Sequence, residues 1–198
     1  FSGIIGGGLA NIFGNYGLQL STATNYGFLI KTAGAFNVLL AFLILREPIS
    51  KFKGILLTVM LTGSYLLSTN GQLLMPRFGD IFILLAALGY AAASVLNRKV
   101  LKKDMNPNTV SFYRAGFGFL ISFLAISLFT NVATQPQFLW GVVLYGFLQS
   151  IIFIFLNKTL QIASSSYVGM LSMSVPVIVA IIAIPAFHET QTLIQWLG

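Results

Sequence analysis

Long apolar runs separated by short polar segments dominate this chain. The seven runs occupy residues 1–20, 22–45, 54–68, 81–96, 110–130, 138–156 and 166–187. About twenty apolar residues in a helix cross the roughly 30 Å hydrocarbon core of a bilayer, so each run is a candidate transmembrane helix. The third and fourth runs are short, and we expect their helices to extend into flanking residues. A membrane β-barrel would instead alternate polar and apolar residues in segments of about ten. The pattern predicts an all-α polytopic membrane protein with about seven transmembrane helices and the start of another.

Composition and charge agree with a membrane location. Hydrophobic residues make up 57% of the chain and charged residues only 8%, against about 25% charged in soluble domains. Eight Lys and Arg residues fall in loops 46–53, 98–104 and 157–163, whereas the alternate loops contain only Arg77. Because basic loops remain in the cytoplasm, we expect these three loops to be cytoplasmic and the protein to be multi-pass in the cell membrane (inner or plasma membrane). The net charge of +7 is then a topology signal and does not indicate a nucleic-acid partner.

A polar pattern occurs twice within the chain, once near each end. The sequence IFGNYGLQL at 12–20 returns as IFLNKTLQI at 154–162, and nine of 36 positions are identical between 12–47 and 154–189. The matched Asn, Gln and Glu residues carry most of the weight, because apolar residues match often by chance. The copies begin in the first and the sixth run, which makes five runs per repeat, and an odd number places the copies in opposite orientations. Inverted repeats are typical of carriers that work by alternating access.

Three motifs resemble the EamA-type drug/metabolite transporter family of the DMT superfamily. They are SVPVIVAIIAIPAFHE at 174–189, LLAFLILREP at 39–48 and FYRAGFGFL at 112–120. The resemblance implies ten helices in two inverted five-helix repeats. Residues 1–72 would then be the last three helices of the first repeat, and 79–198 the second repeat without most of its final helix, in a fragment truncated at both ends. Gly34 stands where the second copy has Pro176, so we expect a proline break in only one of the paired helices.

Polar side chains at a spacing of four form stripes on three predicted helices. Asn11 and Asn15 lie on the first, Tyr90 and Ser94 on the fourth, and Tyr145 and Gln149 on the sixth; this spacing keeps side chains on one side of a helix. Such stripes avoid lipid because an unpaired amide in hydrocarbon costs several kcal/mol. They either join helices by hydrogen bonds or line a substrate cavity. These six residues are cavity candidates, whereas Gln19, Asn157 and Gln161, at helix ends, favour the packing role.

Two basic residues lie inside predicted spans. Lys31 is about three residues from the centre of its span, and a charge at that depth usually faces a cavity or a partner. Its side chain is too short to reach the interface comfortably, so we expect Lys31 to contact an anionic or carboxylate group or to act as a gate. Arg114 lies only about one turn inside its helix, and we expect it to snorkel to the cytoplasmic interface.

The remaining charged residues predict structural roles. Asp80 is placed to cap the fourth helix, and Glu47 and Glu189 end helices at turns in both repeats. An enzyme would need paired acids, metal ligands or an activated nucleophile. The chain has no Cys and a single His, His188, at a helix end, so we expect neither a catalytic site nor a metal or cofactor.

The resulting prediction is a secondary transporter whose partners are a small-molecule substrate and the lipid bilayer. It would carry small metabolites such as amino acids or related compounds by alternating access. The alternative is a flippase for a lipid or lipid-linked sugar, which would need a lateral opening to the bilayer.

Overall fold

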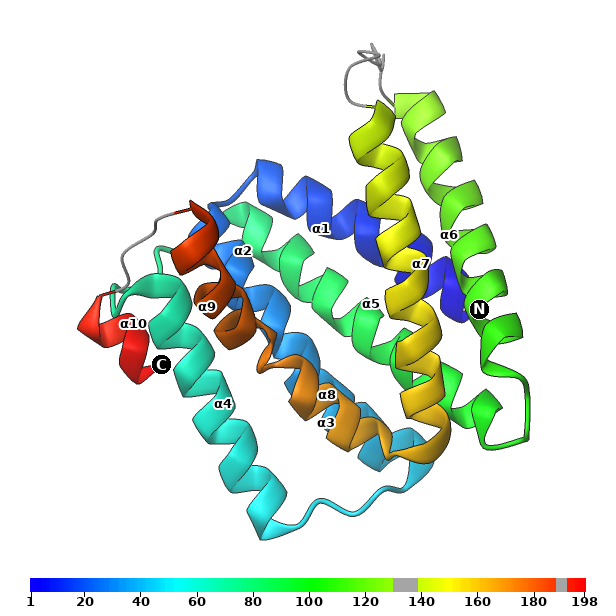
Figure 1. The fold of residues 1–198 in the computed structure, drawn as a ribbon, viewed down its shortest axis with the longest axis horizontal. Coiled ribbons are helices and arrows are strands. Elements are labelled where there is room, and N and C mark those ends of the chain that lie inside the picture. Colours follow the sequence, from blue (N-terminus) through cyan, green and yellow to red (C-terminus); the bar gives the residue numbers. More distant parts are fainter. Residues whose placement is uncertain (130–138, 188–191) are drawn as a thin grey trace.

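The computed structural model describes residues 1–129, 139–187 and 192–198, and the secondary structure of this described part is entirely helical. Its elements are the π-helix η1 (Gly3–Leu9), α1 (Ala10–Gln19), α2 (Ala23–Leu29), the 3₁₀ turn η2 (Ile30–Thr32), α3 (Ala33–Leu45), α4 (Lys51–Thr69), α5 (Phe78–Leu101), α6 (Pro107–Phe129), α7 (Leu139–Ile162), α8 (Ser165–Ser172), α9 (Val175–Phe187) and α10 (Leu193–Leu197). Figure 1 shows their arrangement, with α5 in the middle of the molecule.

These elements coincide with the predicted apolar runs. η1 and α1 make up the first run, α2, η2 and α3 the second, and α8 and α9 the seventh, while α10 begins a further helix. α4 and α5 extend into the flanking residues as expected. The all-α prediction is therefore confirmed. Four described segments are long and apolar enough to cross a membrane, namely Ala23–Leu45, Lys51–Thr69, Phe78–Leu101 and Val143–Ile162.

Apolar side chains cover the outside of the bundle, and small side chains fill its interior. On α4, Phe52, Ile55 and Val59 are all more than 60% exposed, whereas Ala86 and Ala87 of α5 are completely buried. Small residues let helix backbones approach closely, which is how helices associate where lipid removes the hydrophobic driving force. The central position of α5 thus follows from its alanine-rich composition.

Helix boundaries recur at the same offset along the chain as the sequence motif. α3 spans Ala33–Leu45 and α9 spans Val175–Phe187, and α4 and α10 begin at Lys51 and Leu193. The offset that aligns the two motifs also aligns both ends of α3 with those of α9 and the start of α4 with that of α10. An internal duplication would produce this agreement between helix boundaries and sequence motif.

The caps of the paired helices are also equivalent. The hydroxyl of Thr22 accepts a hydrogen bond from the N–H of Asn25 at 3.0 Å, and the hydroxyl of Ser164 accepts one from Tyr167 at 3.3 Å. An N-cap hydroxyl satisfies an N–H that has no partner inside the helix. Ser50 at α4 and Thr192 at α10 repeat this arrangement. The polar groups that begin these helices therefore recur at the same offset as the sequence motif.

Both paired helices are interrupted, so the expectation of a break only at the proline-containing copy is wrong. The first is interrupted by η2 and the second by the turn at Met173 and Ser174. The hydroxyl of Thr32 donates to the carbonyl of Leu29 at 2.6 Å, and that of Ser174, at the matching position of the second copy, donates to Leu171 at 2.7 Å. Hydroxyls that bond nearby carbonyls compete with helical hydrogen bonds. Pro176 instead lies in the first turn of α9, where a missing N–H costs no bond.

Asp80 joins the starts of α2 and α5, which confirms its predicted capping role. Its carboxylate accepts hydrogen bonds from the N–H of Arg77 at 2.8 Å and from the amide of Asn25 at 2.9 Å, and the hydroxyl of Ser21 also donates to it. One carboxylate thus satisfies donors from two segments that lie far apart in the sequence.

η1 and α6 approach through a pair of glycines. A Cβ atom on Gly118 would lie 2.9 Å from backbone atoms of Gly7, whereas one on Gly116, on the same helix, would meet nothing within 4 Å. This contact fixes the distance between the first and fifth predicted spans, both of which carry residues of the cavity described below.

We expect Gly118→Val to destabilise the protein by about 1–3 kcal/mol, because overpacking a close contact forces backbone shifts. The thermal unfolding midpoint of the purified full-length protein in detergent measures this. Gly116→Val, which adds the same side chain to open space, is the control. Equal midpoints for the two variants would contradict the close approach.

Candidate functional site

A polar cavity lies between α1, α5, α6 and α7. It has two compartments, of about 660 and 280 Å³. Six residues line both of them: Asn11, Tyr90, Arg114, Tyr145, Gln149 and Phe153. The smaller compartment extends to α3 and α8, where Gly34 and Gly169 contribute to its wall. A cavity of this size, with a few convergent polar groups, is typical of a small-molecule site.

Six of the seven predicted site residues lie on this cavity. Asn11, Asn15, Tyr90, Tyr145 and Gln149 line the larger compartment, and Ser94 lines the smaller one. Lys31 lies in the 3₁₀ turn η2 and is not among the residues that line either compartment. A role in substrate binding stays a prediction for all seven.

Asn11 and Tyr90 connect α1 to α5 across the cavity wall. The amide N–H of Asn11 donates to the carbonyl of Gly7 at 2.6 Å, and its oxygen accepts from the Tyr90 hydroxyl. The Asn11 amide therefore makes its hydrogen bonds within the cavity wall. The amide of Gln149, on α7, has no hydrogen-bond partner among the described residues.

Arg114 is buried in the cavity wall, so the prediction that it reaches the cytoplasmic interface is wrong. Only 4% of its surface is exposed, and its guanidinium carbon lies 4.5 Å from the ring centre of Phe153 on α7. Among the described residues, its buried Nε and Nη1 atoms have no hydrogen-bond partner. A cation over an aromatic face gains electrostatic attraction, but this contact leaves the N–H donors free.

The sequence contained a signal that would have placed Arg114 correctly. Arg114, Gly118 and Ser122 are spaced by four on α6, and all three line the larger compartment. This is the same spacing as that of the other polar stripes. Tyr26 and Asn37 also line the cavity, and no comparable stripe marks either one.

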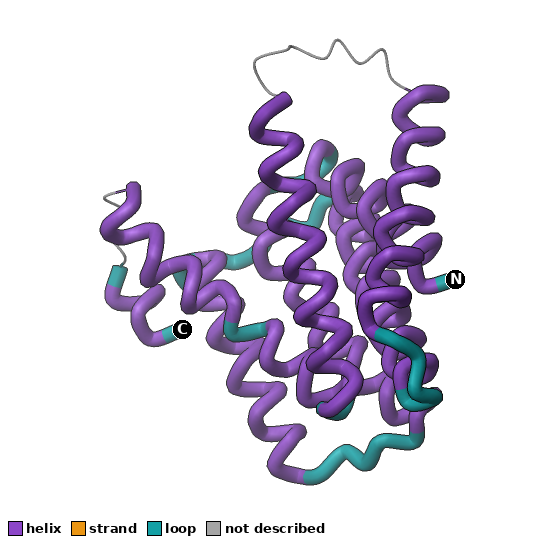
Figure 2. The backbone as a smooth tube through the Cα atoms, turned by 45° about the vertical axis from the view of Figure 1, so that its right-hand side comes forward, coloured by secondary structure: helices purple, strands orange, loops and turns teal. Residues whose placement is uncertain are grey.

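The three helices α5, α6 and α7 are joined at one end by an amide network. The Asn97 amide donates to Asn157 at 3.0 Å, and Asn157 donates to the hydroxyl of Ser111 at 2.8 Å. Asn157 is fully buried, which confirms its predicted packing role. From this end, α6 and α7 separate toward the segment 130–138 that connects them (Figure 2), and the cavity residues of both helices lie beyond the network.

A profile of the EamA-like transporter family matches residues 1–69 and 77–198. The chain belongs to the EamA-like transporter family. It is an integral membrane protein, as the family and its apolar helices show together.

This EamA-like chain is similar to a curated transporter and to a solved structure. The uncharacterized transporter YetK of Bacillus subtilis (strain 168) is 33% identical over 139 residues, which cover 66% of this chain and 42% of YetK. The chain thus matches less than half the length of this relative. A solved structure described as "Crystal structure of protein" is 19% identical and covers 99% of this chain and 71% of the other, with a TM-score of 0.85; it shows that the fold is shared.

Glu47, which follows α3, caps the start of α8 in the second matched segment of the EamA-like chain. Its carboxylate accepts hydrogen bonds from the N–H groups of Ser165 and Ser166, both at 3.0 Å, and from the Ser166 hydroxyl at 2.6 Å. A carboxylate at a helix N-terminus satisfies free N–H groups and complements the helix dipole. This contact fixes α8, whose Gly169 and Ser172 line the smaller compartment. Glu189, the matching residue in the second copy, lies outside the described residues.

The hydrogen bonds at α8 keep Glu47 ionised. Burial raises the pKa of Glu47, but the bonds from Ser166 and Ser165 and the positive charge of Lys102 lower it more. In the folded protein, the pKa of Glu47 therefore lies below the ordinary value of 4.5. A carboxyl group with a lowered pKa stabilises the folded state at pH values above its pKa in the unfolded chain. This stabilisation is lost as the pH falls through the pKa of the folded state.

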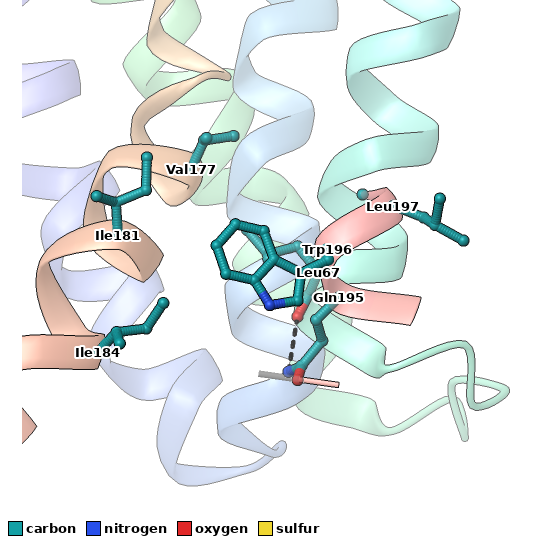
Figure 3. A pocket seen from close by; sticks show the side chains of 8 residues that line it. Leu67, Val177, Ile181, Ile184, Gln195, Trp196 and Leu197 are labelled. Atoms are coloured by element: carbon teal, nitrogen blue, oxygen red, sulfur yellow. Dashed lines mark hydrogen bonds between the residues drawn. The ribbon is translucent and has the colours of Figure 1, made fainter. Parts of the chain in front are cut away.

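A third pocket, between α4, α9 and α10, is almost entirely apolar. Its volume is about 220 Å³, and Leu67, Val177, Ile181 and Ile184 contribute to its wall (Figure 3). The amide of Gln195 is directed to the Leu67 carbonyl, at 3.5 Å. With its polar group turned to the backbone, this pocket offers little to orient a polar ligand.

We expect Glu47→Gln to lower the free energy of unfolding by about 2 kcal/mol at neutral pH, because hydrogen bonds to a charged group are replaced by weaker ones. The wild-type protein should also lose stability as the pH falls below about 4.5, and the variant should lose less. Thermal unfolding between pH 7 and about pH 3 measures both effects. Asp104→Asn, at an exposed turn, is the control; an unchanged pH profile in Glu47→Gln would contradict the role of the cap.

Proposed function

We propose that this chain forms the substrate-binding core of a secondary transporter for small polar metabolites such as amino acids or related compounds. The observation that carries the proposal is the polar cavity between α1, α5, α6 and α7. Amide, hydroxyl and guanidinium groups are costly inside a membrane protein, and they are retained where they face a substrate path.

Contributions from both halves of the chain to the cavity support transport by alternating access. The larger compartment takes Asn11 and Tyr26 from one matched segment of the family profile and Tyr90, Arg114 and Gln149 from the other. If the two segments are inverted repeats, rocking one against the other changes which side of the membrane the cavity faces. We place loops 46–53, 98–104 and 157–163 in the cytoplasm and the protein in the cell membrane, in line with the distribution of basic residues.

The matched helix breaks support the same mechanism. Residues just after the first break (Gly34) and just before the second (Ser172) line the smaller compartment. Discontinuous helices at the repeat interface are a recurring feature of transporter binding sites. Lys31 lies within the first break, and its proposed contact or gating role stays a prediction.

One observation favours the flippase as a second candidate. Tyr145, which lines the larger compartment, is 67% exposed, and Gly146 and Ser150 beside it are exposed as well. The wall of the larger compartment on α7 is therefore open in the described part of the chain, where a lipid headgroup could enter from the bilayer. Transport of labelled short-chain phospholipid in place of soluble metabolites would favour this candidate.

We expect Gln149→Leu to reduce counterflow about fivefold or more, because it removes a polar group from the cavity at nearly constant volume. The assay uses the full-length protein in proteoliposomes with pooled labelled amino acids, organic acids and nucleobases. Thr159→Val is the control, because Thr159 lies on the same helix, bonds its own backbone and lines neither compartment. If both variants transport at the wild-type rate, the cavity is not the substrate site.

A further inference from the structure

The guanidinium of Arg114 has a charge without a protein counter-ion in the cavity. The three acidic residues in the described part of the chain are engaged or remote: Glu47 binds α8, Asp80 joins α2 to α5, and Asp104 is exposed in a turn. No described residue that lines either compartment is acidic. A buried cation is costly unless an anion or several acceptors satisfy it. Because Arg114 lines both compartments, an anion in the cavity would supply the missing counter-charge.

The surroundings of Arg114 leave its charge uncompensated. The guanidinium carbon lies 4.5 Å from the ring centre of Phe153, and Nε and Nη1 are enclosed by protein without a hydrogen-bond partner among the described residues. A guanidinium forms strong, charge-assisted hydrogen bonds with a carboxylate. Gln149 and Tyr145 line the same compartments and supply neutral polar groups for the rest of a ligand.

The charge balance favours a carboxylate over a phosphate monoester. Arg114 is the only Lys or Arg among the described residues that line the two compartments. One cation neutralises one carboxylate, whereas a phosphate monoester carries nearly two negative charges at neutral pH and would leave one of them uncompensated.

We propose that Arg114 binds the carboxylate of the transported molecule, so that the substrates are small carboxylic acids or amino acids. This inference rests on the proposed function and specifies its substrate class. Arg114 then acts as the specificity-determining residue, and a ligand that lacks the carboxylate leaves its charge without a counter-ion.

The test compares acids with their own amides. Full-length protein in proteoliposomes exchanges the labelled amino acid and organic acid pools, and each acid and its primary carboxamide compete for uptake. Wild-type protein should prefer the acid by about tenfold or more, as expected for a charge-assisted hydrogen bond. Arg114→Gln should reduce this ratio to near one. Lys99→Gln removes an exposed cation from α5 and should leave the ratio unchanged.

For variants that do not transport, ligand binding is measured by the shift of the thermal unfolding midpoint. Acids should raise the thermal unfolding midpoint of the wild-type protein in detergent, amides should not, and Arg114→Gln should lose the effect. If Arg114→Gln does not fold, Arg114→Lys keeps the charge without the planar fork and should lower the acid-to-amide ratio severalfold; an unchanged ratio would overturn the assignment.

The failure of this inference differs from the failure of the proposed function. Equal competition by acids and amides in the wild-type protein overturns the role of Arg114, while the exchange itself still supports a metabolite carrier. No exchange of any soluble pool, together with a midpoint raised only by short-chain phospholipid, overturns both and supports the flippase.

Discussion

The structure depends on one constraint: polar groups inside a membrane protein must find their partners within the protein, because the hydrocarbon core supplies no water. Asn97, Asn157 and Ser111 satisfy one another where three helices meet, and Glu47 satisfies the first N–H groups of α8. These contacts fix the helices around the cavity. Among the described residues, buried donors without a partner remain on Arg98 (Nε) and on Arg114 (Nε and Nη1). Of these two side chains, Arg114 lines both compartments of the cavity, where no described lining residue is acidic, so its charge is the one that we expect a ligand to compensate.

The same constraint explains how an internal repeat survives in an apolar chain. Substitutions among Leu, Ile, Val and Phe cost little on a lipid-facing surface, so most of the apolar positions diverge. The hydroxyls of Thr22 and Ser164, which begin paired helices, and of Thr32 and Ser174, which interrupt them, make specific hydrogen bonds and recur at matching positions of the two copies. The helix breaks beside the smaller compartment are thus set by side chains that compete for backbone carbonyls.

Long apolar runs predicted the helices, and polar stripes at a spacing of four predicted most of the cavity residues, because both patterns lie within one segment. The polar stripes brought Asn11, Tyr90 and Gln149 to the same cavity. The burial of Arg114 was predicted wrongly, because the prediction used its position along the helix and not the stripe that it forms with Gly118 and Ser122. Its burial is set by Phe153 on α7 and by the glycine contact with η1, both of which are tertiary. The link between Glu47 and α8 joins segments far apart in the sequence and has no local signal.

The most direct test of alternating access measures from which side of the membrane the cavity can be reached. Ser122→Cys places a single thiol in the larger compartment, in a cysteine-free background of the full-length protein, and a membrane-impermeant maleimide is applied to vesicles of each orientation. The account predicts labelling of Ser122→Cys from both sides, with protection by a transported substrate, and labelling of Lys158→Cys from the cytoplasmic side alone. Labelling of Ser122→Cys from one side only, with or without substrate, would contradict it.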